Sequence, residues 1–407
     1  MATVPLPEGA VLLHVGPYKT GSTAIQNALF DRQDVLAEHG VAYPGTQYRA
    51  ARPGWAVINW SPAWVETPDI SEWDTFAAEV REGGGLRVCV STEDFGSTGR
   101  AELAQKIVGD LGGDNVHVLY VCRALHRVLP SHWQERVKSA VETRPYEAWL
   151  RSVLLPAERD EAGVAFWRSH DLDRVAPAWL TAVGPERFHL LVTDDSDRAL
   201  LRTTFERMLA LPDSYLDTDA GEGNQSMSMN AIELLRRLNV LATERGWPTG
   251  EYMELVRQGA FKELRAMADT NRDERIPTLP EWALAPTEQI ADRRIETIKR
   301  LGLDAIGDPD CLRLPRDFEA SKALTPPVQI SMDAAVAFTA GLIERDHQVR
   351  DRIRGKVAEQ RGRADRERRR AERLRAEKRA LTTPTGAGQL GYRTLIGEVL
   401  RRPFRRG

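Results

Sequence analysis

The chain is predicted to adopt an α/β fold in which a central parallel sheet is flanked by helices. Short runs of apolar and β-branched residues recur in its first half, and segments with helical periodicity separate them. Runs that are apolar throughout are typical of strands buried on both faces, as in parallel sheets. The predicted strands span Val11–Val15, Arg87–Ser91, Val116–Val121 and Phe188–Thr193.

Composition is consistent with a large folded body. The chain has 407 residues, of which 42% are hydrophobic and 28% charged, which is enough to form a sizeable core in one or two domains. The apolar run near the start, Val11–Val15, is too short to span a bilayer. The N-terminus lacks the basic region and cleavage site of a secretory signal, so we expect a cytoplasmic protein.

The three cysteines are expected to be reduced thiols. Cys89 and Cys122 lie inside apolar runs, where cysteine behaves as a small hydrophobic residue, and Cys311 completes an odd number.

The C-terminal part differs from the rest in composition. Residues 331–381 contain no proline and are rich in Ala, Glu, Arg, Asp and Lys, which predicts a long charged helix. Residues 382–407 read as a linker followed by a basic amphipathic tail. We therefore expect a main domain over 1–330, with the helix and tail after it. A partial 3-4 spacing indicates at most a weak coiled coil, formed by Val349, Ile353, Val357, Ala364, Ala371, Leu374 and Leu381.

The stretch HVGPYKTGST follows the first predicted strand and precedes a helix predicted over Ser22–Phe30. In such a turn the loop N–H groups and the positive end of the helix face the same point, which favours an anion. The nucleotide-triphosphatase loop G-x-x-x-x-G-K-[ST] places its lysine after the second glycine, whereas Lys19 precedes Gly21. The pattern predicts a phosphate site of a different kind.

In this form the stretch resembles the loop of sulfotransferases that use 3′-phosphoadenosine 5′-phosphosulfate (PAPS). The resemblance implies a P-loop-type sulfotransferase fold over residues 1–330 and an enzyme that transfers a sulfuryl group. It also implies that the 5′-phosphosulfate is held by Gly16, Lys19, Thr20, Gly21, Ser22 and Thr23, with Lys19 acting in catalysis. A sulfuryl group carries less charge than a terminal phosphoryl group, so cationic side chains and backbone donors suffice and no metal is expected.

A second motif fits the same family. Its members bind the 3′-phosphate of the donor with an arginine at a strand end and a serine eight residues later. Here Arg123 follows the strand Val116–Val121, and Ser131 lies eight residues beyond it. A guanidinium grips a phosphate dianion well, and a hydroxyl near a helix start completes the site. Pro130 departs from the pattern, because proline favours the first turn of a helix and shifts its expected start.

Glu93 is the predicted general base. It lies in LRVCVSTEDF at the carboxyl end of a predicted strand, where open α/β sheets bind ligands, and the family has an S-x-E stretch there. A carboxylate in this place would take the proton of the acceptor hydroxyl or amine. The alternative is a structural, capping or arginine-paired carboxylate. The rival bases are His14, His126, His132 and His170.

The resemblance continues through WLTAVGPERFHLLVTDD and NQSMSMNAIELLRRLN. In the second stretch Asn224 and Ser226 either touch the nucleotide or cap the following helix. The whole similarity covers residues 10–345, and the chain is most similar to uncharacterised sulfotransferase-like proteins of actinobacteria.

The acceptor and partners stay open. Trp55, Trp60, Trp64 and Trp73 lie in a Pro-rich segment; exposed rings would stack on sugars or lipids, and buried rings would anchor the loop. We prefer a carbohydrate or glycolipid acceptor. The tail suits an anionic membrane surface, which would make the protein peripheral at its inner face, and the helix suits a homodimer; no nucleic acid is expected. The alternative functions are a P-loop kinase and a catalytically silent scaffold.

Overall fold

The computed structural model describes residues 4–62, 64–83, 85–217, 227–267, 277–321 and 330–382. Within them, six strands form one sheet in which every pair is parallel, in the order β2-β3-β1-β4-β5-β6. The α/β prediction is therefore confirmed. The strands are β1 Val11–His14, β2 Val41–Ala42, β3 Arg87–Ser91, β4 Val116–Cys122, β5 Phe188–Val192 and β6 Ala305–Ile306.

All four predicted strands are present, and their ends differ from the prediction by at most one residue. The two further strands, β2 and β6, each have only two residues and lie at the sheet edges. A strand this short leaves no alternation in the sequence, so it is not detectable from the pattern.

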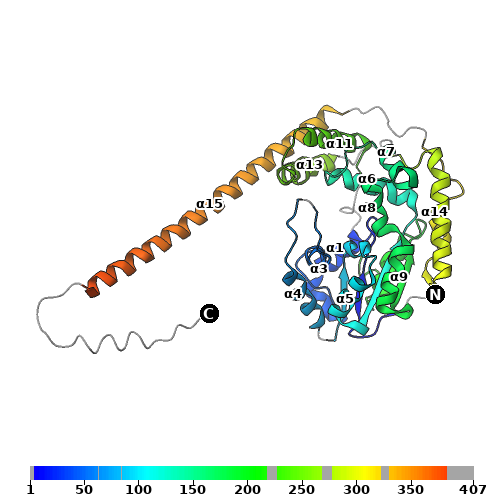
Figure 1. Cartoon of the computed structure of the whole chain (residues 1–407), viewed down its shortest axis with the longest axis horizontal. Coiled ribbons are helices and arrows are strands. Elements are labelled where there is room, and N and C mark those ends of the chain that lie inside the picture. The colour runs from blue at the N-terminus through cyan, green and yellow to red at the C-terminus, as the bar shows by residue number, and fades with distance from the viewer. Residues whose placement is uncertain are drawn as a thin grey trace, which may run out of the picture. The chain divides into compact units, whose positions relative to one another are not determined.

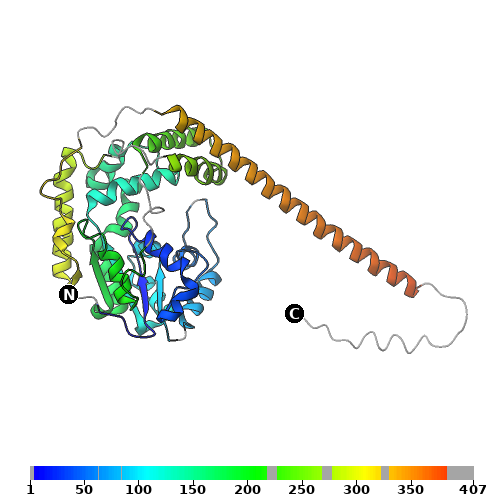
Figure 2. The same cartoon turned by 180° about the vertical axis from the view of Figure 1, so that it is seen from behind.

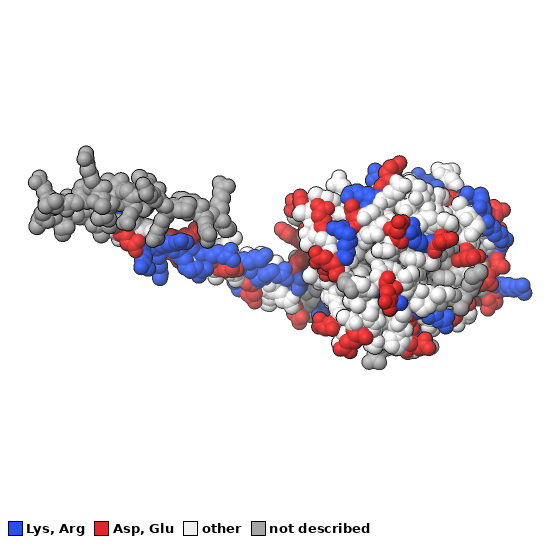
Figure 3. Space-filling view, turned by 90° about the horizontal axis from the view of Figure 1, so that it is seen from below, with Lys and Arg blue, Asp and Glu red and all other residues white. Residues whose placement is uncertain are grey.

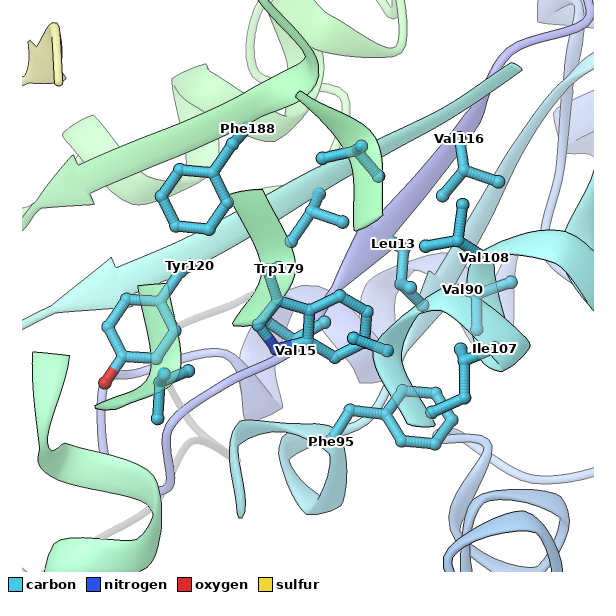
Figure 4. Close-up of a cluster of buried hydrophobic side chains, with 14 of the residues drawn as sticks. Leu13, Val15, Val90, Phe95, Ile107, Val108, Val116, Tyr120, Trp179 and Phe188 are labelled. Atoms are coloured by element: carbon cyan, nitrogen blue, oxygen red, sulfur yellow. The ribbon is translucent and has the colours of Figure 1, made fainter. Parts of the chain in front are cut away.

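Both faces of the sheet are buried, as near-continuous apolar strands require. Alternate residues point to opposite faces, so Leu13 and Val15 contribute to one core and Leu12 to the other. Figure 4 shows the first core, where Trp179 and Phe95 pack beside the strands. The helices of that face are α3 Ala51–Ile58, α4 Ile70–Arg81, α5 Ala101–Leu111, α9 Leu172–Val183 and α14 Glu281–Arg300. Those of the opposite face are α1 Thr23–Asp31, α2 Gln33–Leu36 and α10 Leu200–Met208.

A separate helical cluster forms a third core and lies beyond one end of the sheet (Figures 1 and 2). Aromatic residues fill it, with Trp133, Trp149 and Phe166 fully buried. Its helices are α6 Leu125–Lys138, α7 Tyr146–Leu154, α8 Glu161–His170, α11 Met229–Glu244, α12 Thr249–Tyr252, a π-helix Met253–Ala260 and α13 Phe261–Met267. The short 3₁₀ segments within the described residues are Ala37–His39, Glu93–Ser97, Gly113–Asn115, Pro156–Glu158, Pro185–Arg187 and Pro309–Leu312.

The predicted long charged helix is confirmed as α15, Met332–Thr382. The chain divides into two units, residues 1–345 and 346–407, and α15 begins in the first, where Phe338 and Leu342 pack against the helical cluster. Residues 383–407 lie outside the described residues, so the predicted linker and tail stay predictions, as does the domain boundary at residue 330. No helix in the described ranges is long and apolar enough to cross a membrane.

The structure shows which of the cysteines and tryptophans named above are buried. Cys89 and Cys122 are buried free thiols, and burial raises the pKa of Cys122 to about 11. Trp55 and Trp73 are buried anchors, whereas Trp60 is 50% exposed. The aromatic segment therefore serves partly to hold its own loop in place.

Trp73 should be essential to the packing of this face. Its indole donates to Asp110 Oδ2 at 2.7 Å and lies edge-on to Phe95. Trp73→Ala should lower the free energy of unfolding by about 3–5 kcal/mol, because it leaves a cavity in the core and removes the hydrogen bond to Asp110. Trp60→Ala is the control and should change it by less than about 0.5 kcal/mol. Equal effects in urea unfolding would contradict this assignment.

Candidate functional site at the carboxyl edge of the sheet

The predicted site residues converge on the carboxyl edge of β1, β3 and β4. After β1 the chain continues to β2 and β3 on one side of the sheet, whereas after β4 it continues to β5 and β6 on the other. Loops diverge at such a point and leave room for a ligand. The loop Val15–Ser22, the residues after β3 and Arg123 after β4 all start from this edge.

Gly16 is required by both conformation and space. Its φ of 92° lies in the region that favours glycine, and an added Cβ would lie 2.9 Å from Glu93 Cα. The loop backbone is thus packed directly on the segment after β3. This contact fixes how the phosphate-loop motif lies relative to Glu93.

Lys19 has a left-handed backbone, with φ of 69°, which is uncommon for a residue with a side chain. Its Nζ lies 3.6 Å from Glu135 Oε2 on α6, and Arg257 binds the other oxygen of Glu135 at 3.1 Å. Burial favours the neutral acid, but Lys19, Lys138 and Arg257 outweigh it and lower the pKa of Glu135. The strained backbone of Lys19 therefore accompanies a side chain whose ammonium group lies beside an ionised carboxylate.

The rest of the loop presents backbone donors. Among the described residues, no acceptor is paired with the N–H groups of Lys19, Thr20, Gly21 or Ser22. The Thr20 hydroxyl donates to the carbonyl of Pro17 at 3.0 Å and is thus used inside the loop. Thr23 begins α1, so the positive end of that helix adjoins the same N–H groups. Together these groups form an anion cradle.

Glu93 lies against the loop and is hydrogen-bonded to it. Its Oε1 accepts from Ser22 Oγ at 2.6 Å and from Gln26 Nε2 at 3.1 Å, and its Oε2 lies 3.5 Å from Arg49 Nη1. Burial favours the neutral acid, but Arg49, His14 and the Ser22 hydroxyl outweigh it and lower the pKa of Glu93. An ionised, buried carboxylate therefore joins the loop, α1 and the segment before α3.

A second carboxylate anchors the loop from the other side. Asp94 accepts a hydrogen bond from the Tyr18 hydroxyl and lies 3.2 Å from Arg49 Nη1, and Thr92 donates to it at 3.0 Å. Burial and the adjacent Asp94 raise the pKa of Tyr18, so its hydroxyl stays a donor. Arg49 thus serves both acidic residues that follow β3.

His14, His126 and His170 are buried, His132 is half-buried, and all four are neutral at pH 7. Burial lowers the pKa of His14 to about 4, although Glu93 opposes this, and Nδ1 of His14 hydrogen-bonds with Ser91 Oγ at 2.8 Å. Burial also lowers the pKa of His126 to about 4 and of His132 to about 3, and places that of His170 far below its ordinary value. His170 stacks with Phe166 and His132 lies edge-on to the same ring, which suits a structural role.

Arg123 is positioned where β4 ends, as predicted from the strand. Its Nη1 donates to the carbonyl of Lys19 at 3.5 Å, and its Nη2 lies 3.2 Å from Asp195 Oδ1, after β5. Arg294 of α14 binds the Arg123 carbonyl at 3.3 Å and the His170 carbonyl at 2.8 Å, which fixes the backbone at this point. Arg123 therefore joins the end of β4 to the phosphate loop.

Ser131 lies on α6, the helix that follows Arg123, but not at the start of that helix. The expected position of Ser131 on the helix that follows the strand agrees with the structure, and its role in binding stays a prediction. Pro130 does not shift the helix start, because α6 begins at Leu125 and holds the proline in its interior with the loss of one backbone bond. Ser131 is half-buried and lies one turn before Glu135, on the side of α6 that faces Lys19.

Asn224 and Ser226 lie outside the described residues. The structure adds site residues that the sequence did not single out. Three lie in or next to quoted motifs, since Tyr18 lies between the two loop glycines, Gln26 follows the loop on α1, and Asp94 follows Glu93. Asp195 ends the TDD stretch after β5, and Glu135 is four residues after Ser131. Arg49 and Arg294 carry no local signal, because their partners are far away in the sequence.

Comparisons with known proteins leave the family open. No protein-family model matches the chain, and no curated protein does. A sulfotransferase from Alicyclobacillus acidocaldarius is similar in structure, with 13% sequence identity over 60% of this chain and 97% of its own, at a TM-score of 0.36. A likeness of this degree assigns neither family nor activity. In the described ranges, no group of three or more His, Cys, Asp or Glu side chains is arranged to hold a metal ion.

The Glu93 network generates a pH dependence. A carboxylate whose folded pKa is lowered stabilises the fold above its ordinary pKa, and this contribution is lost as pH falls through the folded pKa. Glu93→Gln should therefore have a lower free energy of unfolding than the wild type near neutral pH, and this difference should shrink below about pH 4. Urea unfolding across the acid range measures this, and a gap that is constant with pH would contradict it.

Proposed function

We propose that this chain is a sulfotransferase that uses PAPS as donor and transfers its sulfuryl group to a hydroxyl or amine. The observation that carries the proposal is the contact between its two predicted anion sites. The Arg123 guanidinium reaches the Lys19 carbonyl at 3.5 Å, so the loop cradle and the strand-end arginine share one edge of the sheet. A donor with phosphate at both the 3′ and 5′ positions of its ribose needs such a pair.

In this proposal each residue has a stated role. The N–H groups of Lys19–Ser22 bind the 5′-phosphate, with Gly16 and Thr23 shaping the two ends of the cradle. Lys19 offsets the charge that grows on the leaving phosphate oxygen. Arg123 and Ser131 hold the 3′-phosphate. Both cations are paired with carboxylates in the free protein, Lys19 with Glu135 and Arg123 with Asp195, so the donor replaces two internal ion pairs.

The transfer itself is an in-line displacement at sulfur. The acceptor oxygen or nitrogen bonds to sulfur while the bond from sulfur to the 5′-phosphate oxygen breaks. The electron pair of that bond stays on the phosphate, which leaves as 3′-phosphoadenosine 5′-phosphate. A carboxylate takes the acceptor proton.

Two carboxylates are candidates for the base that takes the acceptor proton. Glu93 stays the predicted base, and its Oε2 accepts no hydrogen bond within the described part of the chain. Its bonds to Ser22 and Gln26 also support a role in holding the loop. Glu135 is the carboxylate beside Lys19 Nζ and is 36% exposed, which suits contact with an acceptor. Glu93→Gln and Glu135→Gln separate the two, since the base variant lowers kcat with little change in donor affinity.

An open pocket with several polar groups in its wall supports a hydroxyl-rich acceptor. Its volume is about 350 Å³, it lies between the segment before α3 and helix α4, and Arg49, which contacts Glu93, is part of its wall. Thr46, Gln47, Thr75 and Glu79 line it as well. Amide, hydroxyl and carboxylate groups suit the hydroxyls of a carbohydrate or glycolipid.

The alternative functions are tested by the same ligands. A P-loop kinase would bind ATP with magnesium, and its lysine would follow the second glycine of the loop. A silent scaffold would keep the fold without turnover. The strained Lys19 favours activity, because local backbone strain gathers at functional sites.

Lys19→Ala tests the catalytic role. It should lower kcat by about 10²–10³-fold, because it removes charge stabilisation at the leaving oxygen. It should change the free energy of unfolding by less than about 1 kcal/mol, since the pair with Glu135 is half-exposed. Release of the bisphosphate product in an acceptor screen gives the rate. Unchanged turnover in the variant would contradict the role.

Arg123→Ala tests recognition of the 3′-phosphate. Calorimetric titration without metal should show that the wild type binds 3′-phosphoadenosine 5′-phosphate at least about tenfold more tightly than adenosine 5′-phosphate, and the variant should lose this preference. Asp195→Asn is the matched variant and should bind the bisphosphate more tightly, because the competing carboxylate is gone. Tight binding of magnesium ATP with no response to the bisphosphate would overturn the proposal.

A further inference from the structure

Helix α15 carries an ordered pattern of charge that the proposed reaction does not use. From Arg350 to Lys378 almost every residue is exposed, so no other described part of the chain covers this stretch. Figure 3 shows Lys and Arg gathered along it. Large apolar side chains are exposed as well, with Ile353 at 55% and Leu374 at 58%.

Placed at 100° per residue, the apolar residues share one side of the helix. We call this side the apolar strip; Gln360, Glu367 and Lys378 interrupt it, and Lys356 and Arg375 lie at its two edges. It is narrow, since two of its members are alanines. Its members are Val349, Ile353, Val357, Ala364, Ala371 and Leu374.

Two rows of cations border the apolar strip. We call them the basic rails. One rail consists of Arg350, Arg354, Arg361, Arg368 and Arg375, and the other of Arg352, Lys356, Arg363 and Arg370.

Most acidic residues lie on the outer side of the rails or behind them. Asp351 and Asp365 lie behind the rails, Glu359 and Glu377 lie on the outer side of one rail, and Glu372 lies within the other rail. Several pair with arginines along the helix, such as Glu359 with Arg363 at 2.6 Å and Glu372 with Arg368 at 3.2 Å. These pairs are exposed, so each contributes little and is readily given up to another anion.

A second copy of the chain does not suit this face. If two copies met along the apolar strip, the residues beside the seam would be arginine or lysine on both helices in either orientation. Such like-charge contacts are repulsive. An apolar strip bordered by basic rails therefore suits an anionic partner that has an apolar layer beneath its charges.

We propose that this face of α15 binds an anionic lipid surface. The rails would lie among acidic headgroups, the apolar strip would rest at the boundary of the acyl chains, and the acidic residues behind the rails would face water. Because the strip is narrow, charge supplies most of the attraction, and binding falls steeply with salt. The inference does not depend on the proposed enzymatic function.

The test is sedimentation of the full chain with vesicles of phosphatidylcholine containing about 30% phosphatidylglycerol, compared with phosphatidylcholine alone. The wild type should pellet with the anionic vesicles only, and raising the salt from about 0.1 M to about 0.5 M should release it.

Two variants with equal loss of charge test the face. The rail variant carries Lys356→Gln, Arg361→Gln and Arg370→Gln, and the back variant carries Arg366→Gln, Arg369→Gln and Arg373→Gln. Residues 383–407 are identical in both, so any contribution of the tail cancels. The rail variant should partition at least about tenfold less than the wild type, and the back variant at most about threefold less. Circular dichroism confirms that both keep their helix.

Three results would overturn the proposal. The first is no binding to anionic vesicles by the wild type. The second is an equal loss in the rail and back variants, which would indicate unspecific attraction by net charge. The third is a preference for another partner, shown by a stable dimer in light scattering or by binding to a DNA duplex when vesicles fail to compete.

Discussion

The site depends on one buried ionic interaction, the carboxylate of Glu93 beneath the phosphate loop. It accepts from Ser22 and Gln26 and lies beside Arg49, so the loop, α1 and the segment before α3 share one anchor. A buried charge without such partners would be costly, and here burial is outweighed and the pKa of Glu93 is lowered. The direct contact between Gly16 and the Glu93 backbone adds a steric constraint. The loop is therefore held in shape by the protein before any ligand binds, which is the preorganisation that catalysis by charge requires.

The strand order of the parallel sheet brings the other candidate site residues next to Glu93 and the loop. Because β1 lies between β3 and β4, the residues that follow these three strands meet at one edge. Glu93 comes from one neighbour and Arg123 from the other, and both contact the loop between them. Asp195 after β5 and Glu135 on α6 then balance the two cations of the site. In the proposed reaction these carboxylates keep the two cations oriented until the donor binds. The donor phosphates then replace the carboxylates as the partners of Lys19 and Arg123.

The sequence predicts the fold, and it predicts that the candidate residues lie at one edge of the sheet, for physical reasons. Strands buried on both faces leave continuous apolar runs, and the phosphate loop leaves glycines where φ is positive, as at Gly16 and Gly21. It fails where the cause is long-range. The two-residue strands β2 and β6 form only against their neighbours, Arg49 and Arg294 act on distant partners, and Pro130 is held inside α6 although proline favours a helix start. The role of Glu93 is the subtlest case, because its position after β3 is visible in the sequence, whereas the hydroxyl and amide that engage it are visible only in the fold.

The central claim is that residues 15–23 and 123–131 form one donor site. Hydrogen–deuterium exchange of the full chain measures this directly, since backbone N–H groups that bind phosphate exchange more slowly. On addition of 3′-phosphoadenosine 5′-phosphate without metal, both segments should become protected together, and adenosine 5′-phosphate should protect only the first. Protection of neither segment by the bisphosphate, or of the loop by magnesium ATP alone, would contradict the account.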